Sequence, residues 1–185
     1  MRYPPRPDPA HHPDNEQELS SWECTVTLDD GRCVHVRPIQ ADDSDRLRAL
    51  YERLSPESLY YRFFSPVPPP SDRQLRALTD VDYDTRMALV ATVDDDVVGV
   101  ARYDRARDDD TQAEVAIIVQ DDLQGKGLGT RLMRRLADVG DARGVQRFNA
   151  TVLPENKRVL GLFDRLFDTT HELVDGNIAV RFPVA

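Results

Sequence analysis

The sequence is poor in several residue types, and each shortage excludes a class of protein. Two of its 185 residues are cysteines, too few for a disulfide-built scaffold, and Cys24 and Cys33 lack the spacing of a metal site. Positive charge is also scarce, because 24 lysines and arginines face 33 aspartates and glutamates, for a net charge of −9. This balance argues against broad binding to nucleic acid or to an anionic membrane, since both need a basic face.

Long apolar runs are missing as well. The longest purely apolar run, residues 115–119, is far shorter than the roughly 20 residues that a membrane span requires. The N-terminus has no apolar core of a signal peptide and is interrupted by prolines from Pro4 to Pro13. We therefore expect a cytoplasmic protein without membrane association. The cytoplasm is a reducing compartment, which also suits the low cysteine content.

The chain divides into a tail and one domain. Residues 1–20 are rich in proline and polar side chains and show no periodicity, which predicts a disordered tail. Residues 21–185 begin with a hairpin and three helical patterns. From residue 87 onward, strand patterns alternate with two helical patterns, 127–142 and one that begins at 154–156. This order predicts a domain of the α/β (α+β) class, whose mixed sheet has helices on both faces.

The most informative segment is Gln124-Gly125-Lys126-Gly127-Leu128-Gly129-Thr130. It follows an apolar strand at 114–119 and opens the amphipathic helix at 127–142. Its alternate glycines expose backbone N–H groups with no Cβ in the way, and the helix start adds partial positive charge. Together these features predict a site for a phosphate or a diphosphate.

Two common phosphate-binding motifs do not fit this segment. A Walker P-loop needs a glycine five residues before its Gly-Lys pair and a serine or threonine after the lysine, where this chain has Gln120 and Gly127. The dinucleotide pattern Gly-x-Gly-x-x-Gly needs a glycine at the position of Thr130. The segment therefore belongs to neither of these two classes of phosphate-binding site, and its glycine spacing must match a different pattern.

The pattern that fits is Gln/Arg-x-x-Gly-x-Gly/Ala, which Gln124, Gly127 and Gly129 satisfy. With it, the sequence from about residue 34 to the C-terminus resembles the GNAT superfamily of acetyl-CoA-dependent N-acetyltransferases. The resemblance includes Val36-Arg37-Pro38-Ile39, the hairpin at 87–103, the strand at 113–119 and Leu153-Pro154-Glu155-Asn156. Residues 57–64 also look like the GNAT domains of bacterial protein-lysine acetyltransferases.

The resemblance implies a GNAT acyl-CoA N-acyltransferase fold over residues 21–185, with a mixed central sheet of about six or seven strands. It implies a V-shaped opening between the strand at 114–119 and the strand at 145–152, with acetyl-CoA bound there. The pantetheine arm would pair with the backbone near Ile117 and Val119. Asn156 would contact the cofactor or hold the junction between the strand at 145–152 and the helix after it. The diphosphate would rest on the amides of the glycine segment, namely Gln124, Gly125, Lys126, Gly127, Leu128, Gly129 and Thr130.

Each of these residues also has a purely structural interpretation. The glycines could form only a tight turn between strand and helix. Asn156 follows a proline and could act as a helix N-cap. Lys126 and Arg131 could be solvated rather than bound to phosphate. The sequence leaves these alternatives open.

Acetyl transfer to an amine requires the neutral amine. A lysine-like ammonium has a pKa near 10.4, so holding it deprotonated at pH 7 costs roughly 4–5 kcal/mol. A positioned carboxylate can accept that proton directly or through water. The resemblance makes Glu114 the candidate general base, and strand alternation places it on one face with Ala116 and Ile118. The alternative is an exposed charge at a strand end.

The proton for the leaving thiolate has no clear donor in the sequence. Many relatives use a tyrosine on the helix after the asparagine, but this chain has Phe163 at that position, seven residues past Asn156. A phenyl ring cannot donate a proton. Either water, the product ammonium or another residue supplies it, Tyr103 being a weak substitute, or the step has no dedicated acid.

The predicted activity is transfer of acetyl from acetyl-CoA to a primary amine, a protein lysine or a small molecule, by direct attack in a ternary complex. A longer acyl group is a second hypothesis, and a non-catalytic acyl-CoA-binding regulatory or scaffolding module is a third. Glu114 favours the enzyme, whereas Phe163 favours the module. We expect no metal, because His35 and His171 have no partner pattern. Homodimers are common among the relatives, so a homodimer is possible here. Because only the tail precedes the domain, we expect no appended nucleotide-binding regulatory domain.

Overall fold

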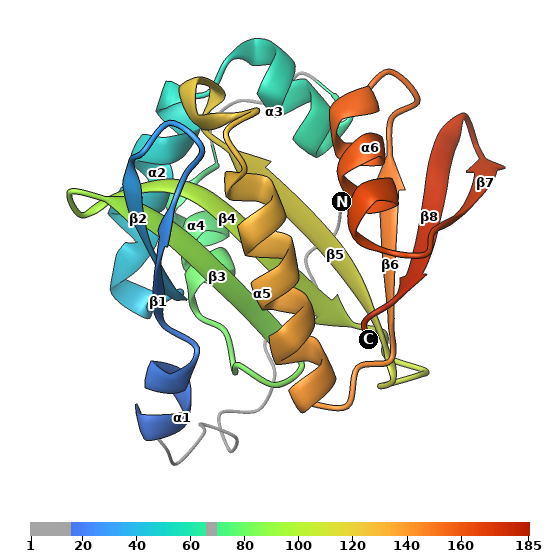
Figure 1. Ribbon diagram of the computed structural model, residues 1–185, viewed down its shortest axis with the longest axis horizontal. Coiled ribbons are helices and arrows are strands. Elements are labelled where there is room, and N and C mark those ends of the chain that lie inside the picture. The colour runs from blue at the N-terminus through green and yellow to red at the C-terminus, as the bar shows by residue number, and fades with distance from the viewer. Residues whose placement is uncertain (1–15, 66–69) are drawn as a thin grey trace.

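An eight-stranded mixed sheet forms the centre of the protein in the computed structural model, which describes residues 16–65 and 70–185 (Figure 1). The strand order is β1-β2-β3-β4-β5-β6-β8-β7, and β5 and β6 form the parallel pair. The sheet has more strands than the six or seven that the resemblance implies, because both strands of the hairpin at each end of the domain join it. The strands are β1 (Cys24–Thr27), β2 (Cys33–Pro38), β3 (Arg86–Val93), β4 (Asp96–Arg105), β5 (Gln112–Val119), β6 (Arg147–Val152), β7 (Thr170–Val174) and β8 (Asn177–Pro183).

Helices cover both faces of the sheet, as the sequence predicts. In Figure 1, α5 crosses the near face over β3, β4 and β5 with α6 beside it, while α2 and α4 lie behind the sheet. Within the described ranges, no helix is both long enough and apolar enough to cross a membrane. The helices are α1 (Glu16–Ser21), α2 (Ser44–Arg53), α3 (Pro56–Phe63), α4 (Asp72–Thr79), α5 (Leu128–Ala142) and α6 (Lys157–Leu166), with short 3₁₀ turns η1 (Ala41–Asp43) and η2 (Asp121–Leu123).

The sheet separates two apolar clusters. The cluster on the α5 face includes Leu132 and Phe148, and the cluster on the opposite face includes Leu50. β5 contributes to both, with Val115 in the first and Ile118 in the second. This split confirms the predicted alternation along β5, because successive strand residues point to opposite faces.

The domain begins earlier than the sequence suggests. The expected disordered tail covers residues 1–20, of which 1–15 lie outside the described part of the chain. Residues 16–20, however, belong to α1. Arg135 donates to the Ser21 carbonyl at 2.7 Å, and Arg143 forms an ion pair with Glu18 at 2.8 Å, so polar contacts to α5 and to the residue directly after it hold this helix. Polar contacts of this kind produce no apolar periodicity, so the sequence pattern does not predict this helix.

The parallel strands β5 and β6 stay together for a short distance. Their register covers three residue pairs, from Gln112 with Arg147 to Glu114 with Asn149. Beyond Glu114 the two strands diverge, while β6 continues to pair with β8 as far as Val152. This is the V-shaped opening that the resemblance implies, and it positions the site described below.

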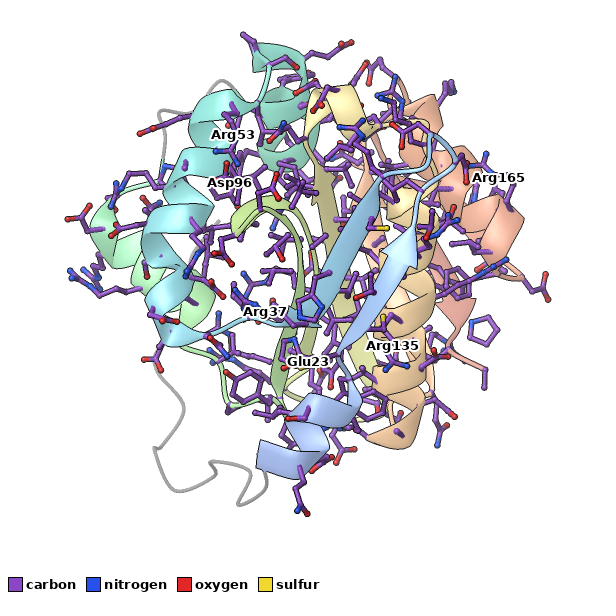
Figure 2. The ribbon with its side chains drawn as sticks, turned by 60° about the vertical axis from the view of Figure 1, so that its left-hand side comes forward. Glu23, Arg37, Arg53, Asp96, Arg135 and Arg165 are labelled. Atoms are coloured by element: carbon purple, nitrogen blue, oxygen red, sulfur yellow. The ribbon has the colours of Figure 1, made fainter. Side chains whose placement is uncertain are left out.

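An ion pair between the half-buried Arg37 and the buried Asp43 fixes the chain where β2 leads to the helices behind the sheet, near Arg37 in Figure 2. Both guanidinium Nη atoms of Arg37 contact the carboxylate of Asp43 at 2.7 Å, and the Gln40 N–H donates to it at 2.8 Å. Burial by itself raises the pKa of Asp43, but the hydrogen bonds from Arg37 and Gln40 outweigh it and hold that pKa below its ordinary value.

This pair predicts an acid-sensitive contribution to stability. Because the pKa of Asp43 is lower in the folded than in the unfolded state, its contribution is present above about pH 4 and is lost as the pH falls further. We expect Asp43→Asn to lower the free energy of unfolding at pH 7 by about 3 kcal/mol, since it leaves the half-buried Arg37 without its anion. Urea unfolding at a series of pH values measures both effects.

The exposed Asp45, also on this segment, provides the control as Asp45→Asn. Below about pH 4, the stability of the Asp43→Asn variant should fall less steeply than that of the wild type, whereas Asp45→Asn should follow the wild type. Parallel pH curves for wild type and Asp43→Asn would contradict the assignment.

Candidate active site

A cleft of about 670 Å³ lies where β5 and β6 diverge. The carboxyl end of β5 forms its floor, α3 and the start of α5 form two walls, and α6 closes the opposite side. Of the residues that the sequence assigns to a cofactor, Ile117, Val119, Gln124, Gly125, Gly127, Gly129, Thr130 and Asn156 line it. The other lining residues are Asp29, Glu57, Ser58, Tyr61, Arg62, Ile118, Asp121, Glu155, Lys157, Arg158, Val159, Leu162 and Arg165.

The edge of β5 that faces the opening carries main-chain hydrogen-bonding groups. The Gln120 N–H donates to the Val98 carbonyl of β4, so the even-numbered residues of β5 direct their main-chain groups toward β4. The register between β4 and β5 is continuous from Gly99 with Val119 onward. The N–H and C=O groups of Ile117 and Val119 therefore point into the opening. An extended polyamide-like ligand could pair with this edge as another strand would.

The glycine segment ends in the free N-terminus of α5. Gly125 and Gly127 have φ values of +75° and +84°, which favour glycine. The Arg131 N–H donates to the Gly127 carbonyl at 3.2 Å as the helix begins. The N–H groups of Leu128, Gly129 and Thr130 precede it and have no intrahelical acceptor. This terminus is suited to an anionic ligand, because it offers donors and the positive end of the helix dipole.

The turn between β1 and β2 lies against the same segment and brings negative charge to it. The Asp29 N–H donates to the Lys126 carbonyl at 3.2 Å. Its carboxylate pairs with Arg131 at 3.4 Å, while Asp30 pairs with Lys126 at 3.1 Å. Hydrogen bonds from Arg32 and Lys126 hold the pKa of Asp30 well below its usual range. Both cations of the segment thus already have carboxylate partners, so neither is simply solvated.

A polar network attaches α3 to the end of β5. Asp121 accepts hydrogen bonds from the Ser55 N–H at 3.0 Å, the Ser55 hydroxyl at 2.7 Å and the Ser58 hydroxyl at 2.8 Å. Gln124 Nε2 donates to Ser58 Oγ at 3.1 Å and to the Val119 carbonyl at 2.8 Å. The network sets the position of α3 over the cleft. Asp121 and Ser58 could not be found from the sequence, because their contact spans more than 60 residues and leaves no local signal.

Asn156 fits its structural interpretation. Its side chain accepts the Val159 N–H at 3.2 Å, so it caps α6. It is also buried and lines the cleft, which leaves its contact with a cofactor as a prediction.

Lys126, Leu128 and Glu114 do not line the cleft. Leu128 packs in the apolar cluster under α5, so that only its main chain could serve a ligand. Glu114 is exposed at the base of the opening, in register with Asp104 of β4 and Asn149 of β6. Its Cα lies about 10 Å from that of Ile117, given the rise of a strand.

Phe163, at the position of the relatives' tyrosine, and Tyr103, the weak substitute, both lie away from the cleft. Phe163 is buried, and its ring centroid lies 5.0 Å from that of Phe182 in the core. Tyr103 is buried too and donates to the Asp84 carbonyl at 3.3 Å. Burial raises the pKa of Tyr103 to about 12. Tyr61, by contrast, lines the cleft and donates to Glu57 at 3.1 Å.

Positive charge in the cleft comes chiefly from α6, which the sequence analysis did not single out. Lys157, Arg158 and Arg165 line the cleft, and none of them forms an ion pair with another described residue. Arg158 and Arg165 are seven residues apart, and this spacing places both on one helix face. The spacing could have indicated a basic surface on α6. Figure 2 shows Arg165 on α6. Within the described ranges, no three His, Cys, Asp or Glu side chains are grouped to hold a metal ion.

Comparison with known proteins identifies the family. The model of the acetyltransferase (GNAT) family matches residues 47–168, which include every described residue that lines the cleft except Asp29. The chain belongs to this family and is an acyltransferase with the GNAT fold. The expected family, fold and enzyme class are thereby confirmed.

Individual relatives agree with this assignment. Acetyltransferase PA5475 of Pseudomonas aeruginosa is 37% identical over 140 residues, which cover 74% of this chain and 75% of the relative. Acetyltransferase Pat of Mycolicibacterium smegmatis is 38% identical over 143 residues, 76% of this chain but 43% of that longer protein. The solved GNAT domain of S. lividans PAT superposes with a TM-score of 0.84 at 37% identity, covering 89% of this chain and 98% of that one. These relatives support the resemblance to the GNAT domains of bacterial protein-lysine acetyltransferases.

The Asp29–Arg131 pair predicts that the β1–β2 turn weakens binding of a polyanion. We expect Asp29→Asn to bind acetyl-CoA about two- to fivefold more tightly, because it removes a carboxylate beside the glycine segment and releases Arg131. Isothermal titration calorimetry with acetyl-CoA measures the change. The gain should shrink as ionic strength rises.

Asp72→Asn is the matched control, since Asp72 also pairs with an arginine, at 2.8 Å, but on α4 away from the cleft. Its affinity should equal that of the wild type. Weaker binding by Asp29→Asn would show that the carboxylate orders the segment for its ligand rather than competing with it.

Proposed function

We propose that this protein transfers the acetyl group of acetyl-CoA to a primary amine, on a protein lysine or a small molecule, by direct attack in a ternary complex. One observation carries the proposal. The edge of β5 near Ile117 and Val119, beside which no strand is paired, and the amides at the start of α5 meet in one cleft. An elongated ligand with an amide-containing arm and a diphosphate matches both features at once.

The proposed contacts with acetyl-CoA are mostly with the main chain. Ile117 would pair with the pantetheine arm through its N–H and C=O groups, and Val119 would lie at the thioester end of the arm, since its carbonyl already accepts Gln124 Nε2. Amides from Gln124 to Thr130 would hold the diphosphate, with Lys126 and Leu128 contributing only their backbone. Asn156 would keep the start of α6 in place beside the ligand, as its cap on Val159 already does.

Glu114 is the proposed general base, acting through water. The new C–N bond forms as the C–S bond breaks, and the proton that leaves the nitrogen must reach a carboxylate. Glu114 lies about 10 Å along the strand from Ile117, so the route includes at least one water molecule. The carboxylate of Asp121 is a poorer base, because three hydrogen bonds outweigh its partial burial and lower its pKa.

The main chain of β5 would also stabilise the negative charge that develops on the thioester oxygen. The Val119 N–H points into the opening and is the proposed donor. The thiolate would then take its proton from water or from the product ammonium, since neither Phe163 nor Tyr103 reaches the cleft.

Replacing the proposed base tests the mechanism. We expect Glu114→Gln to lower kcat by about 10²- to 10⁴-fold, because the amine loses its proton acceptor, while the dissociation constant of acetyl-CoA stays unchanged. Release of free CoA thiol with a panel of amines measures turnover, and calorimetry measures binding. The exposed Glu172 on β7 provides the control as Glu172→Gln, which should keep full activity.

Three other outcomes would each correct the proposal. Turnover of Glu114→Gln at the wild-type rate would remove Glu114 from the mechanism. Binding of acetyl-CoA without acetylation of any amine by the wild type would favour a non-catalytic acyl-CoA-binding module. Faster turnover with a longer acyl-CoA than with acetyl-CoA would identify a different donor.

A further inference from the structure

A second hollow, of about 710 Å³, adjoins the main cleft on the α3 side. It shares Glu57, Tyr61 and Glu155 with that cleft, so the two spaces meet at these three side chains. We call it the side hollow. Its described lining consists of Leu54, Pro56, Glu57, Leu59, Tyr60, Tyr61 and Glu155.

The two spaces differ in charge. Arg62, Lys157, Arg158 and Arg165 line the main cleft but not the side hollow. The charged residues of the side hollow, among those that the structure describes, are the carboxylates Glu57 and Glu155. One oxygen of Glu57 accepts the Tyr61 hydroxyl at 3.1 Å, and its other oxygen has no protein donor in the described chain. The junction therefore has acceptor capacity left for a cation.

The remaining walls are apolar and aromatic. Leu54 is buried, while Tyr60 is 39% exposed, so its ring forms part of the open surface. The Tyr60 and Tyr61 ring centroids lie 6.1 Å apart. Such walls suit a ligand with an apolar stem and a cationic end, because aromatic faces attract cations.

The junction is held in position by the rest of the fold. Asp121 binds both Ser55 and Ser58, which flank Glu57 in the first turn of α3. Glu155 comes from the turn between β6 and α6, directly before the capping residue Asn156. The two carboxylates thus belong to elements on opposite sides of the opening, and a ligand that reached both would pass into the main cleft.

We propose that the side hollow binds the acceptor, a lysine side chain carried on a polypeptide, and that Glu57 and Glu155 select its ammonium group. The inference rests on the proposed acetyl transfer and assigns its acceptor. The anionic donor would lie against the cations of the main cleft, Arg62 and those of α6, and the cationic acceptor would lie in the side hollow, whose described charged residues are carboxylates. The hollow is far larger than a single amine side chain requires, which leaves room for flanking residues of a peptide.

The test compares acceptor kinetics of charge-neutral variants. The acceptors are a peptide with one lysine and a blocked N-terminus, and Nα-acetyl-lysine amide, which carries the same ammonium alone. We expect Glu155→Gln and Glu57→Gln each to raise the KM of both acceptors roughly ten- to thirtyfold, because charged hydrogen bonds are lost. The kcat at saturating acceptor and the affinity for acetyl-CoA should stay within about twofold, a split that a folding defect would not produce.

Glu52→Gln is the matched control, since Glu52 is an exposed glutamate on α2 that lines neither space. In the wild type, the peptide should have a lower KM than the single amino acid. Equal KM values for the two acceptors would overturn the polypeptide assignment. Unchanged KM values in both variants, with normal wild-type turnover, would overturn the side hollow alone. A wild type that acetylates neither acceptor but acetylates another amine would overturn the lysine assignment alone, whereas a wild type that acetylates no amine would count against the proposed transfer itself.

Discussion

The divergence of β5 and β6 is the constraint on which the rest of the site depends. Main-chain groups inside a sheet normally pair with the next strand, and leaving them unpaired costs free energy. Here the pairing ends at Glu114, so the edge of β5 near Ile117 and Val119 faces a cleft instead of a strand. Gln124 satisfies the Val119 carbonyl from the adjoining segment. The fold thus maintains a strand edge in its interior that a ligand can complete.

Charge is distributed around this opening in a way that suits two substrates of opposite sign. The α6 face presents cations, while α3 and the turn before α6 present Glu57 and Glu155. The acidic turn between β1 and β2 is the exception, because Asp29 and Asp30 neutralise the cations of the glycine segment. In this account, affinity for the donor depends mainly on the main-chain amides and on α6, and the acidic turn moderates it.

Much of this architecture could be predicted from local patterns. Alternation along 114–119, the glycine spacing and the amphipathic helix after it are short-range signals, and the structure contains all three elements. Long-range polar contacts could not be predicted, because Asp121 with Ser55 and Arg135 with Ser21 join segments that no periodicity connects. Residue type alone shows that Phe163 cannot donate a proton. Its packing against Phe182 is another long-range contact, and no local pattern predicts it.

The most direct test of the central claim follows the amide protons of β5 and α5 by hydrogen exchange in NMR, with and without acetyl-CoA. The account predicts that the amides of Ile117 and Val119, and those from Gly127 to Thr130, become protected on binding. The amide of Ile118, already directed toward β4, should change little. Saturating binding with protection confined to other segments would contradict it.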